Sequence, residues 1–64
     1  MNLKEIKKAI AAGKTVHWAS SYYVVIKDSI GQYLIHCKGN DNYIGLTHQD
    51  GITMNGHEKD FYIE

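Results

Sequence analysis

The sequence predicts an α+β domain in which one N-terminal amphipathic helix packs on a small, meander-like antiparallel β-sheet of about four or five strands. Residues 2–12 carry apolar side chains at helical spacing, residues 22–46 alternate as strands do, and turn-forming residues separate the alternating runs. The chain has 64 residues and no low-complexity linker, so we expect a single domain covering 1–64 with a small core.

The predicted helix begins at Asn2, whose side chain can accept a hydrogen bond from the first helical turn. Glu5 follows three residues later and completes the pattern of a capping box. Leu3, Ile6 and Ile10 recur at the spacing that places them on one helical face. A helix of this length is marginal alone in water, so it should lie on the sheet.

The long alternating run should form three antiparallel strands joined by tight turns at residues 28–31 and 39–42. A four-residue first turn places Val24 opposite Ile35, and the second turn places Ile35 opposite Leu46. This register collects one apolar face, which the helix would cover. The members of this predicted face are Tyr22, Val24, Ile26, Tyr33, Ile35, Cys37, Ile44 and Leu46.

The opposite face of this predicted sheet is also more apolar than a solvated face would be. Its candidate binding residues are Tyr23, Val25, Leu34, His36 and Tyr43. One short helix covers only one side of a sheet, so we expect these side chains to form an exposed patch that binds a second copy of the chain or another protein. The alternative is that the C-terminal segment folds over this face and places Phe61 and Ile63 there.

Segments at both ends extend the predicted sheet. Residues 15–18 have the character of a first strand, with Trp18 at the edge of the core, and residues 61–63 have that of a closing edge strand. Between them, Asn55-Gly56 is a strong turn signal.

Four histidines and Cys37 are the candidate metal ligands of this chain, and Cys37 is its candidate nucleophile, because Ser20, Ser21 and Ser29 lie in ordinary predicted turns. Their spacing matches no metal-binding pattern, and His36 and Cys37 are neighbours in a strand that point to opposite faces. Cys37 should be buried among apolar residues, where the thiolate is disfavoured. We therefore predict no metal site, no cofactor, no catalytic residues and no enzymatic activity.

The charge composition bears on nucleic-acid binding. The net charge is zero with neutral histidines, and all seven basic residues are lysine. Tyr23 and Tyr43 could stack on bases, with Lys27 and Lys38 near the phosphate backbone. The absence of arginine counts against this interpretation, so a small nucleic-acid-binding module is an alternative and not the leading hypothesis.

The N-terminus does not have the pattern of a signal peptide, and no apolar run approaches the roughly 20 residues that span a bilayer. A single cysteine on an apolar strand suits a reducing compartment. We therefore expect a cytoplasmic protein without a membrane partner.

Seven runs of residues carry a resemblance to a known group of proteins. They are Lys14–Trp18, Tyr23–Asp28, Gly31–Cys37, Ile44–Thr47, Asp50–Gly51, Asn55–Gly56 and Asp60–Tyr62. In these runs, which are spread from residue 14 to residue 62, the sequence resembles short proteins encoded by bacterial phages, prophages and plasmids. The resemblance implies a mobile element in a bacterial cytoplasm, and it assigns no functional residues.

Short phage proteins in that setting are often binders that redirect or block host machinery, and anti-CRISPR proteins are among them. The resemblance and the apolar second face together favour a non-enzymatic protein that masks a surface of a host protein or complex. A nucleic-acid-binding module and a homo-oligomeric accessory protein are the alternatives.

Overall fold

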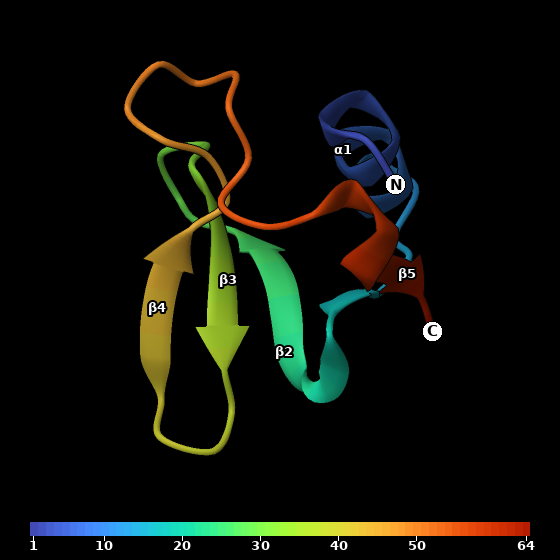
Figure 1. The fold of residues 1–64 in the computed structure, drawn as a ribbon, viewed down its shortest axis with the longest axis vertical. Helices are drawn as coiled ribbons and strands as arrows, with labels where there is room; N and C mark the ends of the chain where they lie inside the picture. The colour runs from blue at the N-terminus through green and yellow to red at the C-terminus, as the bar shows by residue number, and fades with distance from the viewer.

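In the computed structural model, which describes residues 1–64, one helix packs against a sheet of five antiparallel strands. The elements in chain order are α1 (Leu3–Ala11), β1 (Val16–Trp18), β2 (Ser20–Lys27), β3 (Tyr33–Cys37), β4 (Asn42–Gly45), the 3₁₀ helix η1 (Glu58–Asp60) and β5 (Phe61–Ile63). The order across the sheet is β4-β3-β2-β1-β5, so four consecutive strands form a meander and β5 adds to its far edge (Figure 1). The predicted fold class is confirmed.

Helix α1 begins with the predicted capping box. The side-chain oxygen of Asn2 accepts a hydrogen bond from the amide of Glu5 at 2.8 Å, and the Glu5 carboxylate accepts one from the amide of Asn2 at 2.9 Å. Gly13 follows the helix with a φ of 81°, which lets the chain turn towards β1. Ile6 and Ala9 are the buried residues of the helix, and they face the sheet core.

The hydrophobic core lies on one side of the sheet. Its seven buried members are Ile6, Ala9, Val16, Val25, Ile35, Leu46 and Phe61. They come from α1, from strands β1, β2, β3 and β5, and from the residue that follows β4. The segment after β4 rises into a loop and then crosses to β5 at the other end of the sheet, so it helps α1 to cover this side (Figure 1).

The predicted pairing of β2 with β3 was wrong by one residue. Val25, and not Val24, lies opposite Ile35. The reason is the connecting loop, in which the Asp28 carboxylate accepts hydrogen bonds from the amides of Ile30 at 3.0 Å and Gln32 at 2.8 Å. These bonds stabilise a loop of five residues, 28–32, in place of the four-residue turn, and the extra residue shifts every partner along β2.

The predicted pairing of β3 with β4 was wrong by two residues. Ile35 lies opposite Ile44, and Leu46 lies beyond the end of β4 with its amide bonded to the carbonyl of Tyr33 at 3.0 Å. A shift of two preserves the face of each side chain, so Leu46 still reaches the core. Ile44 remains exposed because it lies on the edge strand.

Because the pairing of β2 with β3 differs from the predicted one by one residue, each side chain of β2 lies on the face opposite to the predicted one. Val25 is 4% exposed and lies in the core, and Tyr23 packs against the core with its ring edge-on to Trp18 at 4.9 Å. The placement of these two residues in an exposed patch was therefore wrong. Cys37 shares the face of Tyr23, and it is only half-buried where burial was expected.

Strand β5 is an edge strand as predicted, and it pairs with β1. Phe61 is buried in the core beside α1, and Ile63 is 43% exposed. The alternative in which Phe61 covers the second face is wrong, because its partner Trp18 also lies on the core side. No helix here has the length and apolar character needed to cross a lipid bilayer.

Candidate functional site

The sheet face that points away from α1 is the candidate site, and we call it the open face. Its side chains alternate with those of the core along every strand. The accessible or partly accessible members are Tyr22, Val24, Ile26, Leu34, His36, Tyr43 and Tyr62. Of the five predicted binding residues, the structure brings Leu34, His36 and Tyr43 together on this face and places the other two on the core side.

One line of side chains on the open face crosses the entire sheet, and we call it the cross-strand row. Its members pair successively from β5 to β4 in the order Tyr62, His17, Val24, His36, Tyr43. An aromatic or imidazole ring therefore stands on each side of the central Val24. Neighbouring strands are about 4.8 Å apart, so the row extends for roughly 20 Å.

His36 is held in place from two sides. Its ring stacks on that of Tyr43, with centroids 4.6 Å apart and planes 15° from parallel. Its Nε2 lies 2.6 Å from the Asp41 carboxylate, which the β3–β4 turn presents from a left-handed residue with φ of 60°. Asp41 therefore orients the imidazole, and the imidazole supports the tyrosine ring beside it.

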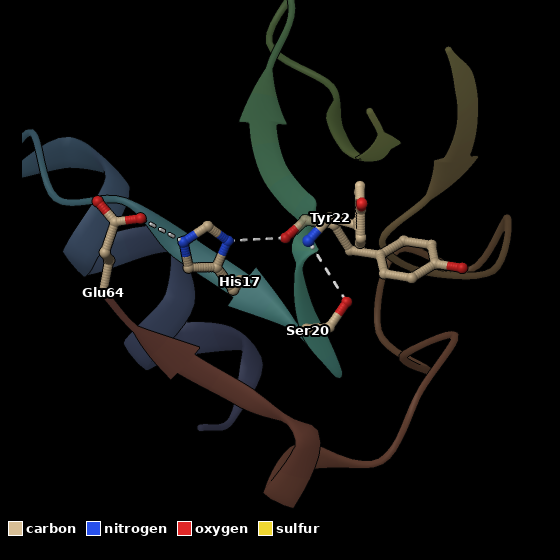
Figure 2. Close-up of polar contacts among 5 residues, drawn as sticks. His17, Ser20, Tyr22 and Glu64 are labelled. Carbon is tan, nitrogen blue, oxygen red and sulfur yellow. Dashed lines mark hydrogen bonds and ion pairs between the residues drawn. The ribbon is translucent and has the colours of Figure 1, made fainter. Parts of the chain in front are cut away.

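His17 is held at the other end of the row, where β2 bulges away from β1. The register shift after His17 leaves three residues of β2 between the partners of His17 and Trp18. The His17 imidazole occupies this irregularity, with Nδ1 2.9 Å from the carbonyl oxygen of Tyr23 and Nε2 2.7 Å from the Glu64 carboxylate. Figure 2 shows the ring between the backbone of β2 and Glu64.

The contacts of His17 hold its ring through both nitrogens. The carbonyl of Tyr23 can only accept a hydrogen bond, so Nδ1 donates on that side, and Nε2 faces the carboxylate of Glu64. The His17 side chain is only 2% exposed, and the ring of Tyr62 lies against it at 5.4 Å. His17 is therefore a structural member of the row, while its neighbours supply the accessible surface.

The open face lacks the thiol of this chain and presents mainly phenol, imidazole and aliphatic groups. Cys37 pairs with Tyr23 and therefore lies on the core side, away from both row histidines. No three histidine, cysteine or acidic side chains lie close enough together to hold one metal ion. The row presents phenol hydroxyls, one imidazole edge and aliphatic carbons, which can make apolar contacts and hydrogen bonds to a partner.

The structure does not assemble the predicted base-stacking site. Tyr23 and Tyr43 lie on opposite faces of the sheet, because Tyr23 shares the core side with Cys37 and Tyr43 lies opposite His36. The ammonium group of Lys27 lies over the ring of Tyr33, 5.8 Å from its centroid. The two tyrosines therefore cannot form one platform for successive bases.

Comparison of the chain with protein-family models, curated proteins and solved structures finds no match. The assignment of a function therefore depends on the residues of this chain.

Several residues of the open face were not predicted from the sequence. The sequence predicted that Tyr22, Val24 and Ile26 share the core face of the sheet. They do share one face, but it is the open face. The signal that could have placed them is Asp28, which suits a longer loop with its side chain bonded to backbone amides. No local signal brings Tyr62 beside His17, because β5 and β1 lie at opposite ends of the chain.

Proposed function

We propose that this protein is a small, non-enzymatic binding protein that masks a surface of a host protein or complex with its open face. The observation that carries the proposal is the cross-strand row, in which Tyr62, Val24, His36 and Tyr43 are accessible or partly accessible on four of the five strands, on the side away from α1. Tyr22 and Tyr43 are 64% and 54% exposed on this face, and large exposed apolar side chains that gather on one face are typical of an interaction site.

The residue types of the row suit a protein partner. Tyrosine combines a large apolar ring with a hydroxyl group, and it is enriched where protein interfaces concentrate their binding energy. His36 is already fixed by Asp41 and by the stack on Tyr43, so little side-chain entropy remains to be lost there on binding. A pre-organised surface of this kind favours docking onto a folded partner.

The charges around the row favour protein over nucleic acid. The carboxylates of Asp41 and Glu64 lie at opposite ends of the row, and both are largely exposed. Phosphate groups that crossed the row would approach these carboxylates and be repelled. The partner surface that fits best is apolar at its centre, with basic groups at positions that reach Asp41 and Glu64.

A role in masking host machinery agrees with the phage and mobile-element setting that the resemblance of the sequence implies. The domain is small, so association with a partner would also add to a limited core. A second copy of the chain is the other occupant that the same surface could take, and the experiment below distinguishes the two.

The test combines capture with mapping. Tagged protein is used to capture partners from a lysate of a bacterial host, in parallel with a Tyr22→Asp/Tyr43→Asp double variant and a Ser29→Asp/Ile30→Asp control in the β2–β3 loop. We expect a captured protein to be lost with the open-face variant and kept with the control. The purified partner should then slow hydrogen exchange in β2, β3 and β4.

Two results would contradict the proposal. Capture that is unaffected by the open-face substitutions would place the contact on another surface. A dimer in sedimentation velocity that the Tyr22→Asp/Tyr43→Asp variant dissociates would assign the open face to a second copy of the chain.

A further inference from the structure

A second surface, on the helix side of the molecule, has the features of a binding groove. It lies between the first two turns of α1 and the segment 52–58, and its volume is about 830 Å³. The residues used in the argument below are Leu3, Lys4, Lys7, Ile52, Met54 and Glu58. Neither of the histidines in the cross-strand row lines this groove, and α1 lies on the opposite side of the sheet from the row.

Apolar side chains form part of the groove. Leu3 and Met54 are half-buried and pack against the core, so their accessible carbons face the groove. Ile52 is 77% exposed, and its amide donates a hydrogen bond to the Asp50 carboxylate at 2.8 Å. An isoleucine on a loop fixed in this way is presented to solvent at a defined position.

The charges of the groove are mainly positive. Lys4 and Lys7 project from α1, and Glu58 is the single carboxylate of the lining. Leu3 and Lys7 also line an adjoining groove of about 500 Å³, which contains His48 and no carboxylate. Lys7 therefore lines both hollows, and each lining has one more lysine than carboxylates.

We propose that this groove binds an acidic segment of a partner protein that also carries apolar side chains. Carboxylates of the segment would meet Lys4 and Lys7, and its apolar side chains would lie on Leu3, Met54 and Ile52. This binding goes beyond the masking role of the open face, and it uses a separate surface.

The lining favours a peptide over a single-stranded nucleic acid. Base binding needs free aromatic faces, and no phenylalanine, tyrosine or tryptophan lines this groove. Tyr33 lines the adjoining groove, and the ammonium groups of Lys7 and Lys27 lie over its ring, at 5.3 and 5.8 Å from the centroid. The apolar lining consists of Leu3, Ile52 and Met54, whose side chains suit leucine or isoleucine side chains of a peptide.

The test is an NMR titration of the ¹⁵N-labelled protein with a synthetic peptide, Glu-Asp-Leu-Ile-Asp-Glu, and with its counterpart Lys-Lys-Leu-Ile-Lys-Lys. We expect saturable shifts of the amides of Leu3, Lys7 and Met54 with the acidic peptide only. Affinity should fall at least about tenfold in a Lys4→Glu/Lys7→Glu variant and fall with added salt. The control, Lys14→Glu/Lys38→Glu, has the same net charge and should bind as the unmodified protein does.

Several outcomes would overturn the proposal. The first two are an absence of amide shifts at millimolar acidic peptide and equal binding of the basic peptide. The third is a set of amide shifts that is confined to the open face. The fourth is tighter binding of an oligothymidylate, titrated in the same way, than of the acidic peptide. Hydrogen exchange of the free variants checks whether they are folded. If the charge variant unfolds, a Leu3→Asn variant tests the apolar contact instead. If the Lys4→Glu/Lys7→Glu variant loses peptide binding but still captures the partner of the open face, the groove and the open face are independent binding sites.

Discussion

The imidazole of His17 joins the carboxylate of Glu64, 47 residues later in the chain, to the carbonyl of Tyr23 on the neighbouring strand. Both hydrogen bonds are short, at 2.7 Å and 2.9 Å. They connect the residue after β5 to β1 and β2 at the point where the ladder between β1 and β2 is interrupted. The side chain of His17 therefore replaces backbone pairing that the bulge removes.

We expect His17→Leu to destabilise the protein by about 1–3 kcal/mol, because the Tyr23 carbonyl would be left without its partner. Glu64→Gln should cost no more than about 1 kcal/mol, since the glutamine amide can still form a hydrogen bond with Nε2 and the side chain of Glu64 is largely exposed to water. Urea unfolding measures both values. An unfolding midpoint for His17→Leu equal to that of the unmodified protein would mean that this bridge does not stabilise the fold.

The register of β2 and β3 is tested by a matched pair of substitutions. Val25→Lys should largely unfold the protein, because it buries an ammonium group beside Ile35 in a core of only seven residues. Val24→Lys should leave the protein folded, because Val24 is half-buried on the open face. Circular dichroism and thermal melting measure both, and the reverse result would support the pairing of Val24 with Ile35.

The fold class was predictable because its signals are local. Apolar spacing and a capping box define α1, and alternation with turn residues defines β2, β3 and β4. The register was not predictable from alternation, because a loop of four residues and a loop of five both agree with it. The hydrogen bonds of Asp28 favour the loop of five residues, and the length of this loop determines which face of β2 is buried.

The candidate site was predicted only in part, for the same reason. Leu34, His36 and Tyr43 belong to β3 and β4, whose two-residue shift preserves faces, so they remained on the open face. Tyr23 and Val25 belong to β2, whose one-residue shift exchanges them with their neighbours. Contacts between distant parts of the chain complete the row, and single-sequence patterns carry no information on such contacts.

Gly56 is required for a close approach to Trp18. A Cβ atom at this position would lie 2.6 Å from Nε1 and 3.2 Å from Cε2 of the indole ring. We expect Gly56→Ala to cost about 1–3 kcal/mol, because the partly buried ring has to move. Gly39→Ala is the control, since its Cβ would meet nothing within 4 Å, and it should change stability by less than about 0.5 kcal/mol. Equal melting temperatures for the two variants would contradict this contact.

The Asp50 carboxylate organises the loop that presents Ile52. It accepts hydrogen bonds from the hydroxyl of Thr53 at 2.6 Å and from the amides of Ile52 and Thr53 at 2.8 and 2.9 Å. These donors, the Thr53 hydroxyl first, lower the pKa of Asp50 from its ordinary 3.8 to about 2. The shift means that the ionised carboxylate is favoured in the folded loop.

A depressed pKa in the folded state contributes stability that is present above pH 3.8 and is lost as the pH falls towards about 2. We expect the side-chain carboxyl carbon of Asp50 to titrate near pH 2 by NMR, and Thr53→Val to move the midpoint up towards 3.8 by removing the strongest donor. A midpoint near 3.8 in the unmodified protein would mean that these bonds do not form in solution, and it would also remove the fixed position of Ile52 on which the groove depends.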